Sequence, residues 1–280
     1  MGLNKNFEKN LVVVPARFYS SRLPGKVMAD IGGEPMLKRV LDNCSKALSN
    51  DSIFVCTDNN KVFKEVQKWG YKVLLTSESC SSGSERIASI IKDLIADAWS
   101  IKAGIFNSKL GKQIIDKTFV INVQGDLPFI DPKCLNNMIL EANKLNNKFD
   151  VITPIYRIKN KGDLEDPNIV KVLVGHRNKV IYFSRSPLPY IRDQHIDNWL
   201  KFHNYWGHVG IYGYKANVLL NWDSLIASKL EDLEKLEQLK LLDNGLVFKT
   251  FKVTGNFLSV DTLDQLEKAR LHLRTKKEIN

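Results

Sequence analysis

Three cationic side chains lie close together in one short segment, PARFYSSRLPGK, which follows an apolar run. Arg17 and Arg22 can donate in a fork to paired phosphate oxygens, and Lys26 adds a compact positive charge. The segment predicts a loop that binds a triphosphate; the alternative is a solvated basic loop. It is not a P-loop, because Val27 follows Lys26, and the chain contains no G-x-G-x-x-G dinucleotide motif.

Two acidic residues stand at positions suited to a metal ion. The run VINVQGDLPFI places Gln124, Gly125 and Asp126 directly after an apolar stretch, and SVDT places Asp261 before an expected helix. Hard cations such as Mg²⁺ prefer oxygen ligands, so the two acids together can bracket one or two Mg²⁺ ions. Taken alone, Asp261 is better explained as a helix cap, and the final helix is expected to be capped at Asp261 or Thr262.

The segment SSGSERI, at residues 81–87, offers backbone N–H groups at the start of an expected helix. Such groups can bind an anion or the edge of a base, and Arg86 can reach a ligand carboxylate. A capping box, formed by Ser82 or Ser84 with a nearby glutamate, explains the same residues equally well.

Polar and aromatic residues gather in the second half of the chain in the segments FSRSPLPY, HVGIYGY and LEQLK. Their donors and acceptors suit a polyhydroxylated ligand. The plainer interpretation is that Phe183, Tyr212 and Tyr214 are core aromatics.

The elements that must position these residues alternate between strand and helix in the first half. Short β-branched runs at 11–15, 53–57, 72–76 and 119–123 predict buried strands, and residues 36–48, 60–69 and 84–95 have helical periodicity. This order predicts an α/β fold with a mostly parallel central sheet covered by helices on both faces. Ligands bind such sheets at the carboxyl ends of the strands, where the motifs above lie.

The second half of the chain has a different pattern of expected elements, with more strands and fewer helices. We expect strands within 151–158, 169–175, 179–185, 208–214 and 246–253, an irregular arm at 187–202, and helices at 230–243 and 262–274. Residues 96–117 are expected to form a helical extension and a surface excursion. The predicted organisation is an α/β half at 1–150, a β-rich region at 151–253, and a C-terminal return with the final helix at 254–280.

Composition bounds the class of protein. The 280 residues include four scattered cysteines and no C-x-x-C pair, so we expect reduced thiols in a cytoplasmic enzyme. The polar N-terminus does not resemble a signal peptide, and no apolar run is long enough for a membrane span. The net charge of +10 favours anionic partners and keeps a nucleic-acid-binding protein open as a distant alternative. Interleaved acids argue against that alternative.

In this order and spacing, the motifs resemble those of the 3-deoxy-manno-octulosonate (Kdo) cytidylyltransferase family, also called CMP-Kdo synthetases. The resemblance spans residues 11–273 and rests on PARFYSSRLPGK, CTD, SGSER, NVQGDLP, YFSRSPLP, HVGIYGY, LEQLK and VDT. The first motif is shared with other sugar-acid cytidylyltransferases. FSR, HVGIYGY and LEQL point to the Kdo branch.

The resemblance implies a nucleotide-diphospho-sugar transferase-like fold in which residues 1–150 bind the nucleotide and residues 151–253 form an inserted β-rich sugar-binding and dimerisation region. It also implies a metal ligand in the C-terminal return at 254–280, a homodimer, and no nucleic-acid or membrane partner. It implies transfer of CMP from CTP to the anomeric hydroxyl of Kdo, with Mg²⁺ and release of pyrophosphate, for lipopolysaccharide synthesis. The catalytic residues implied are Arg17, Lys26, Asp126 and Asp261, of which Asp126 and Asp261 hold the metal. The implied CTP contacts are Ala16, Arg17, Ser21, Arg22, Lys26, Ser82, Gly83 and Gln124. The implied sugar contacts are Arg86, Gln124, Arg185, His208, Tyr212, Glu237 and Gln238.

The chain departs from the family pattern at four places. Leu127 replaces a glutamate, Ser84 a threonine and Lys240 an arginine, and the stretch 96–117 is long. Leu127 leaves Asp126 in place but can alter the sugar pocket or the surroundings of the metal. A modified octulosonate such as 8-amino-Kdo, or a nonulosonic (sialic-type) acid, therefore stays open as the substrate.

Overall fold

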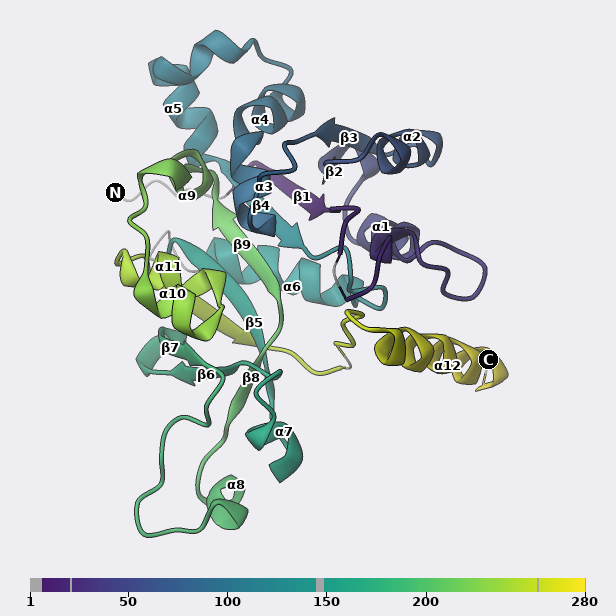
Figure 1. Cartoon of the computed structure of the whole chain (residues 1–280). Helices are drawn as coiled ribbons and strands as arrows, with labels where there is room; N and C mark the ends of the chain where they lie inside the picture. Colours follow the sequence, from purple (N-terminus) through teal and green to yellow (C-terminus); the bar gives the residue numbers. More distant parts are fainter. Residues whose placement is uncertain (1–6, 21, 145–148, 256, 280) are drawn as a thin grey trace.

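The computed structural model describes residues 7–20, 22–144, 149–255 and 257–279. Across these ranges ten strands form one sheet in the order β3-β2-β1-β4-β9-β5-β8-β6-β7, with β10 paired to β5 (Figure 1). The strands are β1 (Lys9–Pro15), β2 (Ile53–Thr57), β3 (Lys72–Leu75), β4 (Thr118–Val123), β5 (Val151–Arg157), β6 (Lys171–Val174), β7 (Val180–Ser184), β8 (Trp206–His208), β9 (Ile211–Lys215) and β10 (Phe248–Lys252).

Helices connect these strands. The α-helices are α1 (Met36–Ser45), α2 (Asn60–Lys68), α3 (Gly83–Ser89), α4 (Ile91–Trp99), α5 (Lys109–Asp116), α6 (Pro132–Lys144), α7 (Lys161–Glu165), α8 (Trp199–Phe202), α9 (Ala216–Leu220), α10 (Lys229–Glu234), α11 (Glu237–Asp243) and α12 (Leu263–Ile279). Short 3₁₀ turns are η1 (Lys26–Met28), η2 (Asn50–Ser52), η3 (Ala103–Asn107), η4 (His176–Asn178), η5 (Ile196–Asn198) and η6 (Trp222–Ser224).

The first half forms the predicted parallel sheet. Strands β3, β2, β1 and β4 pair in parallel, and successive side chains along β1 point to opposite faces. Val12 and Val14 pack into the core beneath α1, α2 and α6, whereas Leu11 and Val13 pack into the core beneath α3, α4 and α9. Helices therefore cover both faces, as the sequence predicted.

The second half corrects the expectation of a mostly parallel sheet. Strand β9 pairs antiparallel with β4 and β5, and β8 pairs antiparallel with β5 and β6. The β6–β7 hairpin completes the edge, so the β-rich region continues the same sheet. The parallel order holds for the first half and for the β10–β5 pair. The expected division at residues 150 and 253 stays a prediction.

Three other expectations needed adjustment. The helix predicted at 84–95 breaks at Ile90, and that predicted at 230–243 breaks at Lys235, which has a left-handed φ of 53°. The stretch 96–117 completes α4 and adds η3 and α5. Its Phe106 and Ile114 are buried in the core, so the stretch contributes to packing instead of being only a surface excursion.

Candidate active site

The predicted phosphate loop begins on a rigid support at the carboxyl end of β1. The Ala16 backbone N–H donates to the Cys56 carbonyl at 2.8 Å, and the Thr57 hydroxyl donates to the Ala16 carbonyl at 2.7 Å. The backbone N–H and carbonyl of Ala16 are therefore both hydrogen-bonded to other residues of the protein. Gly25 has a φ of 67°, a left-handed conformation that glycine favours, and it starts the turn that places Lys26. Ser21 lies outside the described residues.

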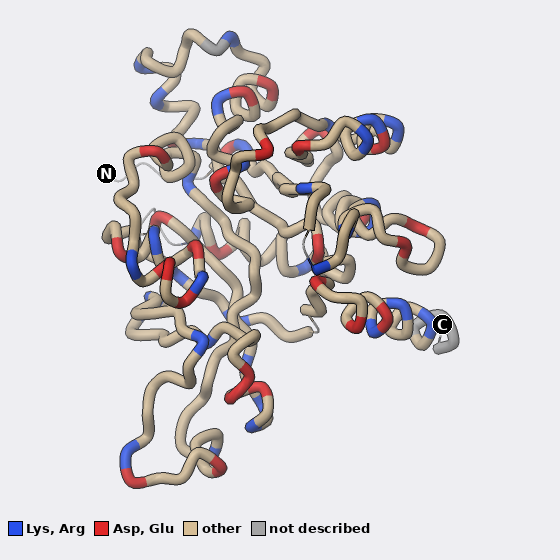
Figure 2. Tube along the Cα trace, viewed as in Figure 1, with Lys and Arg blue, Asp and Glu red and all other residues tan. Residues whose placement is uncertain are grey.

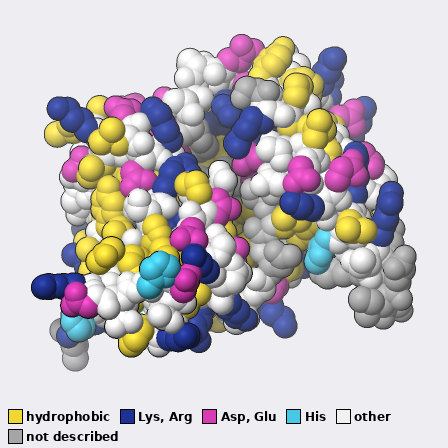
Figure 3. All heavy atoms as spheres, turned by 60° about the horizontal axis from the view of Figure 1, so that its bottom comes forward, with side chains coloured by type: hydrophobic (Ala, Val, Ile, Leu, Met, Phe, Trp, Pro, Cys, Tyr) yellow, Lys and Arg dark blue, Asp and Glu magenta, His cyan; other side chains and the backbone are white. Residues whose placement is uncertain are grey.

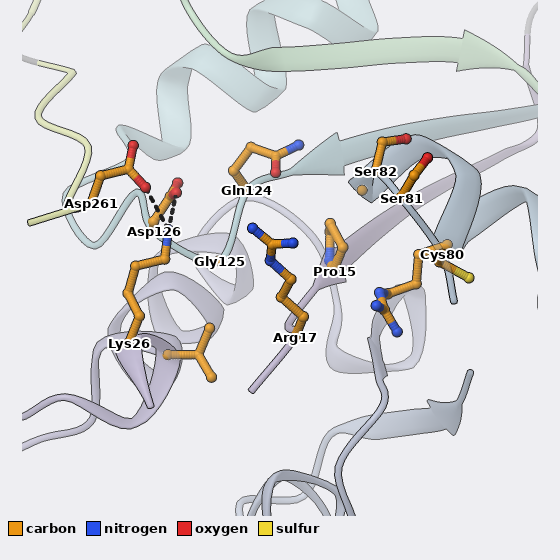
Figure 4. A pocket seen from close by; sticks show the side chains of 13 residues that line it. Pro15, Arg17, Lys26, Cys80, Ser81, Ser82, Gln124, Gly125, Asp126 and Asp261 are labelled. Carbon is orange, nitrogen blue, oxygen red and sulfur yellow. Dashed lines mark hydrogen bonds and ion pairs between the residues drawn. The ribbon is translucent and has the colours of Figure 1, made fainter. Parts of the chain in front are cut away.

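Two acids from distant segments meet at Lys26. Lys26 Nζ lies 2.7 Å from Asp126 Oδ2 and 2.8 Å from Asp261 Oδ1 (Figure 4). The Val260 backbone N–H donates to the Asp126 carbonyl at 3.0 Å, which joins the segment before α12 to the loop after β4. Arg22 approaches Asp261 at 3.3 Å from a more exposed position.

The alternative role of Asp261 as a helix cap is wrong, because Thr262 performs it. The Thr262 hydroxyl accepts the Gln265 N–H, while Gln265 Oε1 accepts from the backbone N–H groups of Asp261 and Thr262. This reciprocal cap starts α12 without the Asp261 carboxylate. That carboxylate is thereby left to face Lys26.

At Lys26 and Asp261, pairing with opposite charges affects the pKa more than burial does. Burial of Lys26 opposes its charge, but Asp126 and Asp261 more than compensate and raise its pKa. Burial of Asp261 likewise opposes ionisation, but Lys26, Arg22 and Arg17 hold its pKa below the usual value. The cluster therefore contains an ammonium ion and ionised Asp261 at neutral pH.

A cavity of about 210 Å³ opens beside this cluster. Arg17 projects into it, between the Lys26 cluster and the segment before α3 (Figure 4). The lining consists of Pro15, Arg17, Lys26, Val27, Cys80, Ser81, Ser82, Gly83, Arg86, Gln124, Gly125, Asp126 and Asp261. Eight residues predicted from the sequence thus meet at one cavity: Arg17, Lys26, Ser82, Gly83, Arg86, Gln124, Asp126 and Asp261.

The start of α3 forms one wall of the cavity. The Ser82 hydroxyl accepts the Glu85 backbone N–H at 3.1 Å, and Glu85 accepts from the Ser81 backbone N–H at 2.9 Å. The capping interpretation is therefore confirmed for Ser82. Gly83 packs closely here, because a Cβ there would lie 3.0 Å from Pro15 and 3.3 Å from the Gln124 amide, so these neighbours would have to shift.

The Arg86 guanidinium is already paired within the protein. It donates to Asp58 Oδ2 at 3.0 Å and to the Thr76 hydroxyl at 2.5 Å, and both members of the ion pair are almost completely buried. Asp58 Oδ1 also accepts the backbone N–H of Phe18. Asp58 and Arg86 therefore connect the phosphate loop to α3.

Of the residues expected at the sugar, Arg86 and Gln124 line this cavity, whereas Arg185, His208, Tyr212, Glu237 and Gln238 lie beyond its lining. Arg185 donates to the carbonyls of Glu234 and Pro167, so its guanidinium is occupied by backbone oxygens. Tyr212 donates to Gln238 Oε1 at 3.0 Å. Glu237 Oε1 accepts from the Ser84 hydroxyl at 2.9 Å, and burial raises the pKa of Glu237 although Ser82 and Ser84 oppose this effect.

His208 is held in one orientation. The Thr153 hydroxyl donates to the Ile211 carbonyl at 2.8 Å, so His208 Nε2–H is the donor in its 2.9 Å contact with Thr153. Burial lowers the pKa of His208 to about 3, and the ring contacts Tyr212. His208, Tyr212 and Gln238 thus form one neutral polar group beside β8 and β9.

Leu127 belongs to the core. Its side chain is 5% exposed and packs in the cluster that contains Val123 and Ile130, and it does not line the cavity. The expectation that Leu127 alters the surroundings of the site finds no support in this position.

Sequence reasoning gave no individual role to several residues that build the site. Asp58 was quoted only as part of the CTD motif, and its link to Arg86 requires the fold. Gly125 and Ser81 were named only within their motifs, and the structure shows that a Cβ on Gly125 would lie 3.0 Å from the Pro15 carbonyl. Cys80, which the sequence did not single out for the site, lines the cavity beside Ser81.

The carboxylates of Asp126 and Asp261 fit a Mg²⁺ ion. The described residues contain no cluster of three or more His, Cys, Asp or Glu side chains that could hold a metal. Oxygens from Asp126 and Asp261 nevertheless converge on one cationic atom, Lys26 Nζ. Mg²⁺ commonly takes one or two carboxylates and completes its shell with phosphate oxygens and water. The two carboxylates of Asp126 and Asp261 match this pattern of ligands.

Charges elsewhere on the molecule are mixed. Lysines, arginines and acids are interspersed along the chain (Figure 2), and the face in Figure 3 shows the same mixture with apolar side chains between them. Pairs such as Lys38–Asp42 and Lys268–Asp264 join neighbouring turns of one helix. In these views the net charge does not gather into the continuous basic surface that nucleic-acid binding uses. Among the described helices, none is long and apolar enough to cross a membrane.

The fold and the site define a nucleotidyltransferase, and comparison with known proteins identifies its kind. A family model described as cytidylyltransferase matches residues 11–251. A 3-deoxy-manno-octulosonate cytidylyltransferase from Thermodesulfovibrio yellowstonii is 33% identical over 95% of this chain and 98% of the relative. The chain therefore belongs to the cytidylyltransferases, and among them to the CMP-Kdo synthetase family.

Other relatives refine this picture. An 8-amino-3,8-dideoxy-manno-octulosonate cytidylyltransferase from Shewanella sp. is 35% identical over 94% of this chain and 98% of the relative. A solved structure of CMP:2-keto-3-deoxy-manno-octonic acid synthetase complexed with CTP has a TM-score of 0.80 and 32% identity, covering 96% of this chain and all of that one. Relatives named for two different sugars are thus similarly close to this chain.

Proposed function

We propose that this chain transfers CMP from CTP to the anomeric hydroxyl of Kdo and releases pyrophosphate. The observation that carries the proposal is the meeting of Lys26, Asp126 and Asp261 at a cavity that also contains Arg17. This arrangement brings cations for a triphosphate together with carboxylates for a metal ion. Phosphoryl transfer needs mainly such positioning and charge neutralisation.

Four charged residues of the cavity, and Arg22 beside it, have a proposed part. Arg17 and Lys26 bind the triphosphate and stabilise the charge that develops on the α-phosphate and on the leaving pyrophosphate. Arg22 reaches the same region from solvent. Asp126 and Asp261 hold Mg²⁺, which when bound lowers the cost of that negative charge. No protein side chain is required as a covalent nucleophile.

Lys26 must change partners during the cycle. Its ammonium group lies between the carboxylates that are proposed to hold the metal. If Asp126 and Asp261 held Mg²⁺ through these same oxygens, Lys26 would donate its hydrogen bonds to phosphate oxygens instead. Without the metal, Lys26 keeps the two carboxylates paired.

The sugar acid is proposed to bind toward β8, β9 and α11. His208, Tyr212 and Gln238 supply uncharged donors and acceptors there, which suit hydroxyl groups. Glu237 and Arg185 border this region but are engaged with protein partners in the structure. A homodimer, inferred from the family, remains part of the proposal.

8-Amino-Kdo is the second candidate substrate, because relatives named for either sugar match this chain equally well. A substrate panel decides between them. Initial rates are measured with CTP and Mg²⁺ and with Kdo, 8-amino-Kdo and a sialic acid offered separately. A kcat/KM at least tenfold higher for Kdo supports the first choice, and a preference for 8-amino-Kdo or the sialic acid replaces it.

A further inference from the structure

Beneath the cavity lies a buried hydrogen-bond network centred on Ser84. The Ser84 hydroxyl lies 2.9 Å from Glu237 Oε1, 2.8 Å from the Tyr214 hydroxyl and 3.2 Å from Asn122 Nδ2. Ser84, Asn122 and Tyr214 are each 0% exposed. They belong to α3, β4 and β9, so the network joins three elements around the wall of the cavity.

When the Glu237 carboxyl is ionised it can only accept, and the hydrogen-bonding capacity of serine then fixes the other directions in this network. A hydroxyl has one proton and two acceptor positions. Ser84 donates its proton to Glu237. Tyr214 and Asn122 must therefore both donate to Ser84, and the amide nitrogen of Asn122 must face it.

The orientation of the Asn122 amide in turn sets the orientation of the Gln124 amide. With its nitrogen facing Ser84, Asn122 turns Oδ1 toward Gln124 and accepts from Gln124 Nε2 at 3.0 Å. Gln124 then has its carbonyl oxygen left for the cavity that it lines. Figure 4 shows this oxygen on the side where Arg17 lies, with the nitrogen turned away. Gly83 lies next to this amide, because a Cβ built on Gly83 would be 3.3 Å from both its nitrogen and its oxygen.

We propose that Asn122 is a positioning residue that makes Gln124 a hydrogen-bond acceptor toward the substrates. The opposite amide orientation would present a donor in a cavity already supplied with donors by Arg17 and Lys26. As held here, Gln124 repels phosphate and carboxylate oxygens and selects a ligand hydroxyl or amino group. The proposal rests on the proposed function for the identity of the ligands.

A double-mutant cycle tests the proposal. Asn122→Leu, Gln124→Met and the double variant are compared with wild type for KM, kcat and calorimetric affinity for CTP and for the sugar acid. Each single variant is expected to raise KM for one substrate about tenfold, the effect of one lost buried hydrogen bond, with kcat within threefold. The double variant should be no worse than Gln124→Met, because Asn122 acts through Gln124. The substrate whose KM rises identifies the donor as part of CTP or of the sugar.

Two further variants serve as a control for the double-mutant cycle and as a replacement for Asn122→Leu. Thr118→Val removes a buried hydroxyl on the same strand, which bonds to Trp99 and Ile114, and it should leave both KM values unchanged. If Asn122→Leu does not fold, Ser84→Ala removes the group that orients Asn122, and it should raise the same KM.

Multiplicative losses of about a hundredfold in the double variant, or unchanged KM values in folded Asn122→Leu or Ser84→Ala, would overturn the proposal. A wild-type chain that binds both ligands without turnover would contradict the proposed function instead. The calorimetric cycle can still be completed in that case.

Discussion

Lys26 donates a hydrogen bond to Asp261 at 2.8 Å, although 235 positions separate the two residues in the sequence. The same ammonium group bonds to Asp126. It therefore lies between the two carboxylates that are proposed to hold the metal ion. This contact connects the phosphate loop to the start of α12 and leads to the first prediction.

Removing Lys26 should strengthen metal binding and weaken catalysis at once. In Lys26→Met, the carboxylates lose their ammonium partner, so Mn²⁺ bound without nucleotide, followed by electron paramagnetic resonance, should increase in affinity about tenfold. Turnover should fall at least about 100-fold, because the same charge is lost from the phosphates. Lys38→Met, which removes a half-buried helical ion pair outside the cavity, is the control. Weaker Mn²⁺ binding in Lys26→Met would contradict the exchange of partners.

The two proposed metal ligands should be separately essential. Asp126→Asn and Asp261→Asn keep the size of each side chain but remove its charge. Each should lower kcat at least about 100-fold, while the melting temperature stays within a few degrees. Asp131→Asn, after the same strand but outside the cavity, should be close to wild type. Near-normal turnover in both site variants would remove the metal assignment.

The buried pair Asp58–Arg86 should support both stability and CTP binding. Asp58→Ala leaves a buried guanidinium without its charge partner and should cost about 3–5 kcal/mol of unfolding free energy. It also frees the Phe18 backbone N–H, so KM for CTP should rise in any protein that stays folded. Chemical denaturation and initial rates measure the two effects.

Two comparisons make this result specific. Asp58→Ala/Arg86→Met removes both charges and should recover part of the lost stability. Glu65→Ala, which breaks the more exposed Lys68–Glu65 pair, should change stability by less than about 0.5 kcal/mol. An equal effect of Glu65→Ala and Asp58→Ala would contradict the structural role of the buried pair.

His208 should make the protein less stable in mild acid. Its pKa is about 3 in the folded chain because the ring is buried, against 6.5 ordinarily. Below pH 6.5 the unfolded chain therefore takes up a proton that the folded chain refuses, and stability falls as the pH falls toward 3. The slope should approach about 1 kcal/mol per pH unit.

Denaturation between pH 7 and pH 4.5 measures this slope. His208→Gln should reduce it, whereas substitution of the exposed His203 by glutamine should leave it unchanged. Identical slopes in wild type and His208→Gln would show that His208 is not held neutral by the fold.

Much of the nucleotide half could be predicted from the sequence. Apolar β-branched runs such as LVVVP and FVINV mark strands whose carboxyl ends meet, which brings Arg17, Lys26, Gln124 and Asp126 to one edge. Local chemistry was sufficient there because strand pairing is parallel and regular.

Other features depend on contacts that no local pattern reveals. Lys235 ends a helix in a left-handed conformation without the glycine that usually marks such a position. Arg86 looked available to a ligand until the fold placed Asp58 beside it. Asp261 resembled a helix cap because Thr262, the residue that does cap α12, is its neighbour.

Pyrophosphate release from CTP tests the central claim most directly. The purified chain is incubated with CTP and Mg²⁺, with and without the sugar acid, and Asp261→Asn is assayed in parallel. The account predicts release that requires CTP, metal and sugar acid together, with one CMP-sugar formed for each pyrophosphate, and its loss in the variant. Folded wild-type protein that binds CTP yet releases no pyrophosphate with Kdo, 8-amino-Kdo or a sialic acid would contradict it.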